Sequence, residues 1–134
     1  MISVLVVALL AVSGLAAPNS NHLDIKRADG DPFIPSGWTA LGCFTDARDS
    51  RTLRTASTTS LDLMTLEVCA GFCTRNFGVF TYAGVEFGRE CYCDNTIREP
   101  AVIADDSGCN IPCTGDTSQN CGGEDRIFIA QRVV

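Results

Sequence analysis

The segment GVEFGRECYCDN, Gly84 to Asn95, carries the main fold signal of this chain, a Cys-x-Cys pair that follows two glutamates. In an extended strand Cys91 and Cys93 project to one face and Tyr92 to the other. We predict two strands, VFTYAGVEF and ECYCDN, joined near Gly88. Three interpretations arise for the thiols and carboxylates: a metal site, a catalytic carboxylate pair, or a cross-linked strand of a small scaffold.

The segment MTLEVCAGFCTRNFG is predicted to form the helix that meets this strand. Thr65 is a suitable N-cap, Glu67 places a carboxylate in the first turn, and Gly78 follows the end. Cys69 and Cys73 then lie one turn apart on one helix face. Two thiols at helical spacing i, i+4 can therefore meet the two thiols of the strand.

Three further segments complete the outline. The composition of GWTALGCFTD, Gly37 to Asp46, predicts a strand, and the apolar run Ile127 to Ala130 predicts a short one. The polar segment Ala47 to Leu63 is predicted to be an exposed connection. Regular alternation along the first strand gives two faces: Leu41 and Cys43 on one, Trp38, Ala40 and Phe44 on the other.

The cysteine count is even, which favours disulfides in a chain that passes through an oxidising compartment. Four bridges allow many connectivities, so spacing alone leaves the pairing open. A structural zinc site usually uses Cys-x-x-Cys knuckles, and no pair here has that spacing. We therefore expect no metal and no cofactor. The eight cysteines are Cys43, Cys69, Cys73, Cys91, Cys93, Cys109, Cys113 and Cys121.

The N-terminal run MISVLVVALLAVSGLAA is apolar, carries no charged side chain and ends in small residues. It predicts a secretory signal peptide over residues 1–16, cleaved after Ala16. A membrane anchor is the alternative interpretation, but the run is short for crossing a bilayer. We expect a secreted protein, extracellular or associated with the cell wall.

The next residues are polar and contain the dibasic pair Lys26 and Arg27. One interpretation is a pro-segment over residues 17–27 that is removed after this pair, and the other is an ordinary solvated loop. Residues 28–36 are then expected to be a flexible N-terminus. The folded domain is expected over residues 37–131, with no stalk, membrane span or second domain after it.

The charge pattern excludes several partners and chemistries. From residue 28 onward the chain has 15 carboxylates, 8 arginines, no lysine and no histidine. Nucleic acid and anionic membranes are bound by clustered basic residues, so neither is an expected partner. Without histidine or lysine the domain lacks the usual general base near neutral pH and any Schiff-base chemistry.

Several blocks of this sequence resemble a known family. The blocks GWTALGCFTD, MTLEVCAGFC, YAGVEFGRECYCDN and CTGDTSQNCGGEDRIFI are similar, in order, to those of the WSC domain, the eight-cysteine module of fungal cell-wall stress sensors. The resemblance covers Gly37 to Gln131 and includes every cysteine. One departure stands out, because the family usually has Gly where this chain has Asp94. Asp tolerates left-handed backbone conformations, so we expect the fold to survive there, with the loop's ligand contacts in doubt.

The resemblance implies a small, disulfide-rich α+β domain in which an antiparallel sheet packs on one helix, as in PAN or apple modules. The two middle bridges that it implies agree with the helix-and-strand geometry described above. The pairing carried over from the family is Cys43–Cys109, Cys69–Cys91, Cys73–Cys93 and Cys113–Cys121.

The resemblance also implies carbohydrate binding. Sugar rings stack on exposed aromatic faces, while carboxylates, amides and Arg bond their hydroxyls. Tyr92 is the strongest candidate because its ring faces away from the disulfide-bonded neighbours. Core packing is the alternative for Phe44 and Tyr82, and Trp38 can simply cap the first strand. The candidate contacts are Tyr92, Trp38, Tyr82, Phe44, Asp46, Arg51, Glu86, Glu90 and Asn95.

Catalysis is not expected. In an extended strand Glu86 and Glu90 would lie roughly 13 Å apart at about 3.3 Å per residue, although a turn at Gly88 would shorten this. Glycosidases hold their two carboxyls across a substrate cleft, and so small a domain offers little surface to build one. Ion pairing with Arg89 or Arg51 is the default role for these glutamates.

Two function classes remain from the sequence. The first is a non-catalytic secreted module that binds a cell-wall polysaccharide, either β-glucan or a chitin-like glycan. The second is a secreted effector or adhesion-type module that binds a protein partner with the same surface.

Overall fold

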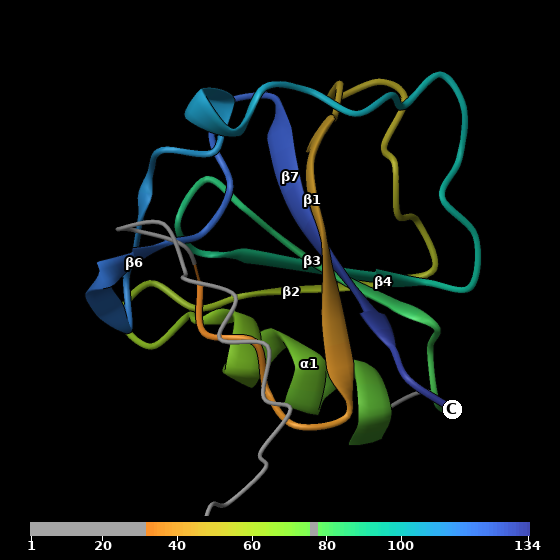
Figure 1. Ribbon diagram of the computed structural model, residues 1–134, viewed down its shortest axis with the longest axis horizontal. Coiled ribbons are helices and arrows are strands. Elements are labelled where there is room, and N and C mark those ends of the chain that lie inside the picture. Colours follow the sequence, from red (N-terminus) through yellow and green to blue (C-terminus); the bar gives the residue numbers. More distant parts are fainter. Residues whose placement is uncertain (1–31, 76–77) are drawn as a thin grey trace, which may run out of the picture.

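The domain is a five-stranded antiparallel sheet, and a helix packs on one face of that sheet (Figure 1). The structure, a computed structural model, describes residues 32–75 and 78–134. The strand order is β1-β7-β3-β4-β2, and β5 pairs with β6 separately. This confirms the expected α+β class. The elements are β1 Trp38–Thr45, β2 Ala56–Thr59, α1 Leu66–Arg75, β3 Tyr82–Glu86, β4 Glu90–Asp94, the 3-10 turn η1 Asp106–Gly108, β5 Pro112–Cys113, β6 Asp116–Asn120 and β7 Arg126–Arg132.

The predicted hairpin lies in the middle of the sheet. β3 and β4 pair antiparallel, with Glu86 opposite Glu90 and Gly84 opposite Tyr92. Gly88 lies in the turn between them with a positive φ of 74°. The hairpin confirms the two predicted strands and brings the two glutamates face to face, which an extended strand would not do.

Two disulfides attach the helix to the hairpin. The Thr65 hydroxyl accepts a hydrogen bond from the Val68 amide at 3.1 Å, which confirms the predicted N-cap of α1. Cys69 bonds to Cys91, and Cys73 bonds to Cys93. The remaining bridges are Cys43–Cys109 and Cys113–Cys121.

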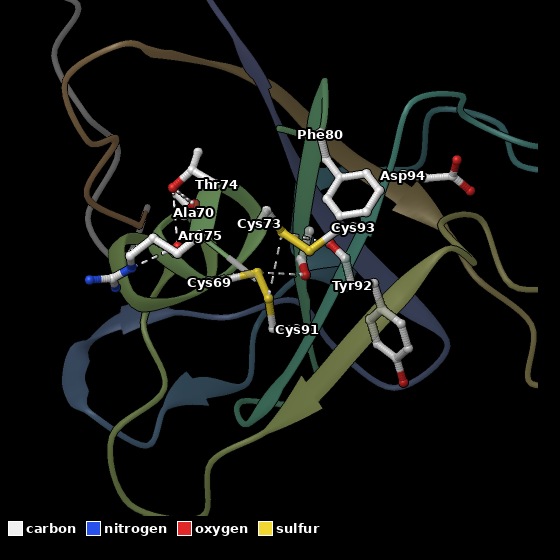
Figure 2. Close-up of a disulfide and its surroundings, with 12 residues drawn as sticks. Cys69, Ala70, Cys73, Thr74, Arg75, Phe80, Cys91, Tyr92, Cys93 and Asp94 are labelled. Carbon is white, nitrogen blue, oxygen red and sulfur yellow. Dashed lines mark hydrogen bonds between the residues drawn. A yellow bond between two sulfur atoms is a disulfide. The ribbon is translucent and has the colours of Figure 1, made fainter. Parts of the chain in front are cut away.

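These four bridges are the pairs that the family resemblance implies. Figure 2 shows the two helix-to-strand bridges side by side, with the ring of Tyr92 on the opposite side of β4. Both bridges form one buried cluster on the helix side of the sheet, together with those apolar residues of α1, β3 and β7 that face the helix, such as Leu66, Val85 and Phe128.

The alternation predicted for the first strand is wrong. The two residues that flank Leu41 pair with consecutive residues of β7, so Leu41 is the extra residue of a β-bulge. Next to it, Gly42 has a φ of 116°. The bulge shifts the alternation by one residue, so residues before and after it exchange partners. Trp38 packs with Cys43 on the helix side, and Leu41 packs with Phe44 on the other side.

The segment Ala47 to Leu63 is not the exposed connection that its polar composition predicted. It contains β2, which pairs with β4 at the sheet's edge, and it buries Thr52 and Leu53. An edge strand with one solvated face carries many polar residues, so its composition resembles that of a loop. The threonines were the signal for a strand, because Thr favours strands.

The signal peptide over residues 1–16, its cleavage after Ala16 and the pro-segment over 17–27 with Lys26 and Arg27 lie outside the described residues and stay predictions. Of the expected flexible N-terminus, Pro32 is buried. The Phe33 amide also donates a hydrogen bond to the Gln119 side chain at 2.6 Å. In the part of the chain that the structure describes, no helix is long and apolar enough to cross a membrane.

Candidate functional site

The face of the sheet opposite the helix carries a second, smaller core. Phe44, Leu53, Ile127 and Ile129 form this cluster, and Tyr82 and Tyr92 pack at its edge. Gly84 of β3 makes the packing possible. A Cβ built there would lie 2.5 Å from the Ile127 Cδ1 atom and 3.0 Å from that of Leu53, so a side chain would displace both.

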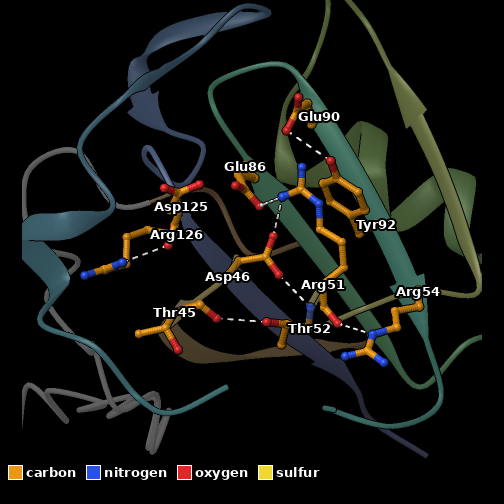
Figure 3. Close-up of polar contacts among 10 residues, drawn as sticks. All are labelled: Thr45, Asp46, Arg51, Thr52, Arg54, Glu86, Glu90, Tyr92, Asp125 and Arg126. Carbon is orange, nitrogen blue, oxygen red and sulfur yellow. Dashed lines mark hydrogen bonds and ion pairs between the residues drawn. The ribbon is translucent and has the colours of Figure 1, made fainter. Parts of the chain in front are cut away.

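A charged group lies beside this small core. We call Arg51, Asp46, Glu86, Glu90 and Tyr92 the Arg51 cluster. The Arg51 Nη1 atom donates to Asp46 Oδ2 and, at 3.0 Å, to Glu86 Oε2. The guanidinium also lies 5.0 Å from the centre of the Tyr92 ring. Figure 3 shows Arg51 between Tyr92 and the two carboxylates, which lie on separate elements.

Hydrogen bonds fix the members of the cluster in place. Asp46 Oδ1 accepts from the Thr52 amide at 2.6 Å, and the Thr52 hydroxyl donates to the Thr45 carbonyl at 2.8 Å. The Tyr92 hydroxyl donates to Glu90 Oε2 at 3.1 Å. The predicted pairing of Glu86 with Arg51 is confirmed as a hydrogen bond, and the loop that carries Arg51 is tied to the end of β1.

The two buried carboxyls of the cluster have divergent pKa values. Burial, and then the neighbouring Asp46 carboxyl, raise the pKa of Glu86 to about 9. Burial alone would raise the pKa of Asp46, but hydrogen bonds from Glu86, Arg51 and Thr52 outweigh it and hold that pKa below its usual value. Glu86 therefore keeps a proton near neutral pH, and Asp46 is the carboxylate that balances Arg51.

This arrangement predicts a stability that falls as pH rises. Between the ordinary pKa of 4.5 and about 9, folded Glu86 holds a proton that the unfolded chain releases. The free energy of unfolding should therefore decrease across that window. The Glu86→Gln variant, which mimics the neutral form, should lose much of this slope in thermal unfolding at about pH 5 and about pH 8.

Glu124→Gln, a change at an exposed carboxylate, serves as the control and should keep the wild-type slope. A Glu86→Gln variant that also keeps the full slope would show that Glu86 is ionised in the folded protein at neutral pH.

Two depressions adjoin on this face. The Tyr92 depression has a volume of about 310 Å³ and the Phe87 depression about 110 Å³, and both include Arg48 and Arg51 in their walls. The Tyr92 depression is lined by Arg48, Asp49, Arg51, Arg54, Ser57 and Tyr92, among others. The Phe87 depression is lined by Arg48, Arg51, Glu86, Phe87, Arg89 and Glu90, among others.

Five of the nine candidate contacts meet in the Arg51 cluster, and the other four lie apart from it. Phe44 is buried in the small core, with Tyr82 at its edge. Trp38 lines a groove of about 370 Å³ beside α1, on the helix side of the sheet. The Asn95 side chain accepts from the Thr81 amide at 2.9 Å and from the Thr81 hydroxyl at 3.2 Å, which links the residue before β3 to the residue after β4.

Asp94, where this chain departs from the family, has a structural role different from the one expected. It ends β4 and does not adopt the left-handed conformation considered above. Its buried carboxylate accepts from the Arg54 amide at 2.9 Å, the Asn95 amide at 2.7 Å and Arg98 Nε at 2.8 Å. Asp94 thereby ties β4 to the loop before β2, close to the Tyr92 depression.

Phe87 and most of the residues that line the Tyr92 depression were not predicted as contacts from the sequence. Arg48, Asp49, Arg54 and Ser57 belong to the segment interpreted as a bland connection. A signal for Phe87 did exist, because a large aromatic residue directly before the turn glycine is unusual where turn residues are normally small or polar.

The carboxylates have no room for substrate between them. Asp46 and Glu86 are only 2% and 3% exposed, and Arg51 bonds to both. Glu90 is bonded by the Tyr92 hydroxyl instead. Three cysteine sulfurs lie close together within the described residues, those of Cys69, Cys73 and Cys91, but disulfides hold all three, so they offer no thiolate to a metal.

Comparisons with known proteins match most of this chain. The family model described as "WSC domain" matches residues 40–123. Two proteins of Arthroderma benhamiae, each named "WSC domain-containing protein", are 33% identical over 96 residues and 38% identical over 99 residues. The matches cover 72% and 74% of this chain, and 10% and 13% of those proteins.

A relative outside the fungi has a different name. The Xylosyltransferase oxt of Drosophila pseudoobscura is 36% identical over 84 residues, which is 63% of this chain and 9% of that protein. This chain thus spans about a tenth of the length of each of these three relatives.

Proposed function

Since this chain belongs to the WSC domain family, whose members are generally non-catalytic carbohydrate-binding or sensor modules, we propose that it is a secreted module that binds a cell-wall polysaccharide. The polysaccharide class is β-glucan or a chitin-like glycan, and the Tyr92 depression is the site. The observation behind this proposal is that the depression combines an aromatic ring with charged and hydroxyl side chains at an open surface.

The ring of Tyr92 is held ready to stack on a sugar. Its hydroxyl is bonded to Glu90, and Arg51 lies over the ring at 5.0 Å, so the side chain has little freedom to lose on binding. Half-buried aromatic rings give a large apolar contact together with a polar handle. A fixed ring of this kind suits the apolar face of a sugar.

The wall around the ring supplies hydrogen-bonding groups. Arg54 Nε donates to the Arg51 carbonyl, and its Nη2 donates to the Glu99 carbonyl at 3.2 Å, which orients the guanidinium without neutralising it. Within residues 32–75 and 78–134, Arg48 and Asp49 form no ion pair. These side chains are therefore available to sugar hydroxyls.

Tyr92→Ala is expected to weaken polysaccharide binding roughly fivefold, because ring stacking contributes on the order of 1 kcal/mol. Tyr92→Phe keeps the ring and should bind nearly as well as wild type. The measurement is co-sedimentation with insoluble β-1,3-glucan and with chitin, backed by titration with soluble oligosaccharides. Tyr82→Ala is the matched control, because Tyr82 lies on the same face but outside the depression.

Two outcomes would count against the proposal. If wild type binds no polysaccharide in the panel above the level of an inert protein, at millimolar oligosaccharide, carbohydrate binding is rejected and the protein-partner function is favoured. If Tyr82→Ala and Tyr92→Ala weaken binding equally, the site lies elsewhere on the face or the variants act through the fold.

A further inference from the structure

Phe87 is exposed and has an unusual backbone conformation. It lies at the tip of the β3–β4 hairpin, is 39% exposed and has a φ of 53°. A bulky residue with positive φ is a steric outlier, and Gly or Asn would fit this position better. Fold stability alone therefore does not account for Phe at this position.

The surrounding structure holds this turn firmly. The Gly88 amide donates to the Cys121 carbonyl at 2.9 Å, and the Thr114 amide donates to the Gly88 carbonyl at 2.9 Å. Both partners belong to the loop that the Cys113–Cys121 disulfide closes. A Cβ at Gly88 would lie 2.5 Å from the Pro112 carbonyl oxygen, so the turn and this loop are in direct backbone contact. The backbone that carries the exposed Phe87 ring is therefore held in one position by its neighbours.

Phe87 repeats the arrangement found at Tyr92. The Arg89 guanidinium lies 5.3 Å from the centre of the Phe87 ring, as Arg51 lies 5.0 Å from that of Tyr92. In each pair an arginine covers part of an aromatic ring in the wall of a depression. The two depressions share Arg48 and Arg51, so they form one continuous surface.

Along the backbone, the two aromatic residues are further apart than the width of one sugar ring. Tyr92 lies opposite Gly84 in the hairpin, and Phe87 follows Gly84 by three residues. At about 3.3 Å per residue the two positions are therefore roughly 10 Å apart along the strands. A pyranose is only about as wide as a phenyl ring, so this separation suits more than one sugar unit.

We propose that Phe87 forms a second aromatic subsite and that the ligand is an extended internal stretch of a linear polysaccharide, lying across both depressions. This rests on the proposed function and specifies it further, since a chain end or a free monosaccharide would use the Tyr92 depression alone. Binding of a longer chain at two linked subsites gains affinity without any change in either one.

The test is a titration of wild type, Phe87→Asn and Tyr92→Ala with linear oligosaccharides of increasing length from the polysaccharide that wild type binds. Wild-type affinity should rise with length until both depressions are filled. Phe87→Asn should bind the shortest ligands as wild type does but lose the gain with length, so that its affinity for long chains falls roughly tenfold. Val102→Asn, a change at an exposed apolar residue outside both depressions, is the control.

Stability separates this effect from misfolding. Asn tolerates positive φ, so Phe87→Asn should unfold at the same temperature as wild type or higher. Equal affinity of Phe87→Asn and wild type at every length would overturn the second subsite while leaving the proposed function intact. Absence of binding by wild type at any length would overturn both.

Discussion

Replacing Cys43 and Cys109 together by alanine is expected to lower the free energy of unfolding by about 4 kcal/mol. The two cysteines are 66 residues apart in sequence, so their bridge restricts the unfolded chain over half the molecule. Natural domains are stable by only about 5–15 kcal/mol, so the variant should be close to unfolding at body temperature. Urea unfolding followed by circular dichroism measures the loss, and the denaturant slope should rise because the freed chain exposes more surface.

The matched control removes the bridge with the shortest loop. Cys113 and Cys121 are 8 residues apart, so the same double replacement should cost about 2.5 kcal/mol by the same loop-entropy argument. The order of the two losses is the test. A larger loss for the Cys113–Cys121 pair would mean that the packing of the Gly88 turn against its loop, rather than chain entropy, determines the contribution of these bridges.

Arg51→Ala is expected to lower the free energy of unfolding by about 3–5 kcal/mol, which is typical when one partner of a buried ion pair is removed. The Asp46 and Glu86 carboxyls would then be buried side by side without a cation. The variant should also become less stable as pH rises, because the remaining carboxyls are tolerated only when protonated. Thermal unfolding at several pH values measures both effects.

Two comparisons test the cause. Arg48→Ala removes an exposed arginine that has no ion pair among the described residues, and it should change the free energy by less than about 0.5 kcal/mol. Adding Glu86→Gln to Arg51→Ala removes the carboxyl that would otherwise ionise beside Asp46 as pH rises, and it should recover part of the loss at high pH. If Arg51→Ala costs no more than Arg48→Ala, the cluster is not a structural unit.

The structural role of Arg51 affects how the proposed site is studied. Arg51 lines both depressions, yet its guanidinium is bound to Asp46 and Glu86, so its replacement would disturb fold and binding together. Tyr92 and Phe87 are better probes, because changes at the half-buried ring and at the exposed turn leave the buried ion pairs in place. Binding data from Arg51 variants alone would not distinguish the two roles.

That the two helix thiols would meet the two strand thiols could be predicted from local periodicity, while the pairing Cys69–Cys91 and Cys73–Cys93 was implied by the family resemblance. A helix places residues four apart on one face, and a strand places residues two apart on one face, whatever the rest of the chain does. The positions of Cys69, Cys73, Cys91 and Cys93 therefore predicted which thiols could meet. The outward direction of Tyr92 followed from the same alternation, and Figure 2 shows it.

The errors arose where pairing between distant segments overrides local pattern. The bulge at Leu41 depends on the register between β1 and β7, and it moved Trp38 to the helix side. The segment that contains β2 becomes a strand because β4 offers it an open edge. Asp94 likewise gains its role from the amide of Arg54, forty residues away in sequence.

Short-range spacing in the sequence was enough to predict the helix N-cap, the hairpin and the side of β4 from which Tyr92 projects, whereas the α+β class was implied by the family resemblance. Only tertiary contacts bring Asp46, Arg51 and Glu86 together as one hydrogen-bonded group, because three separate elements must approach on one face. They also place Phe87 in the depression next to that of Tyr92, since the turn is fixed by backbone contacts with the distant Cys113–Cys121 loop. Such contacts depend on how the chain folds back on itself, and no local pattern records them.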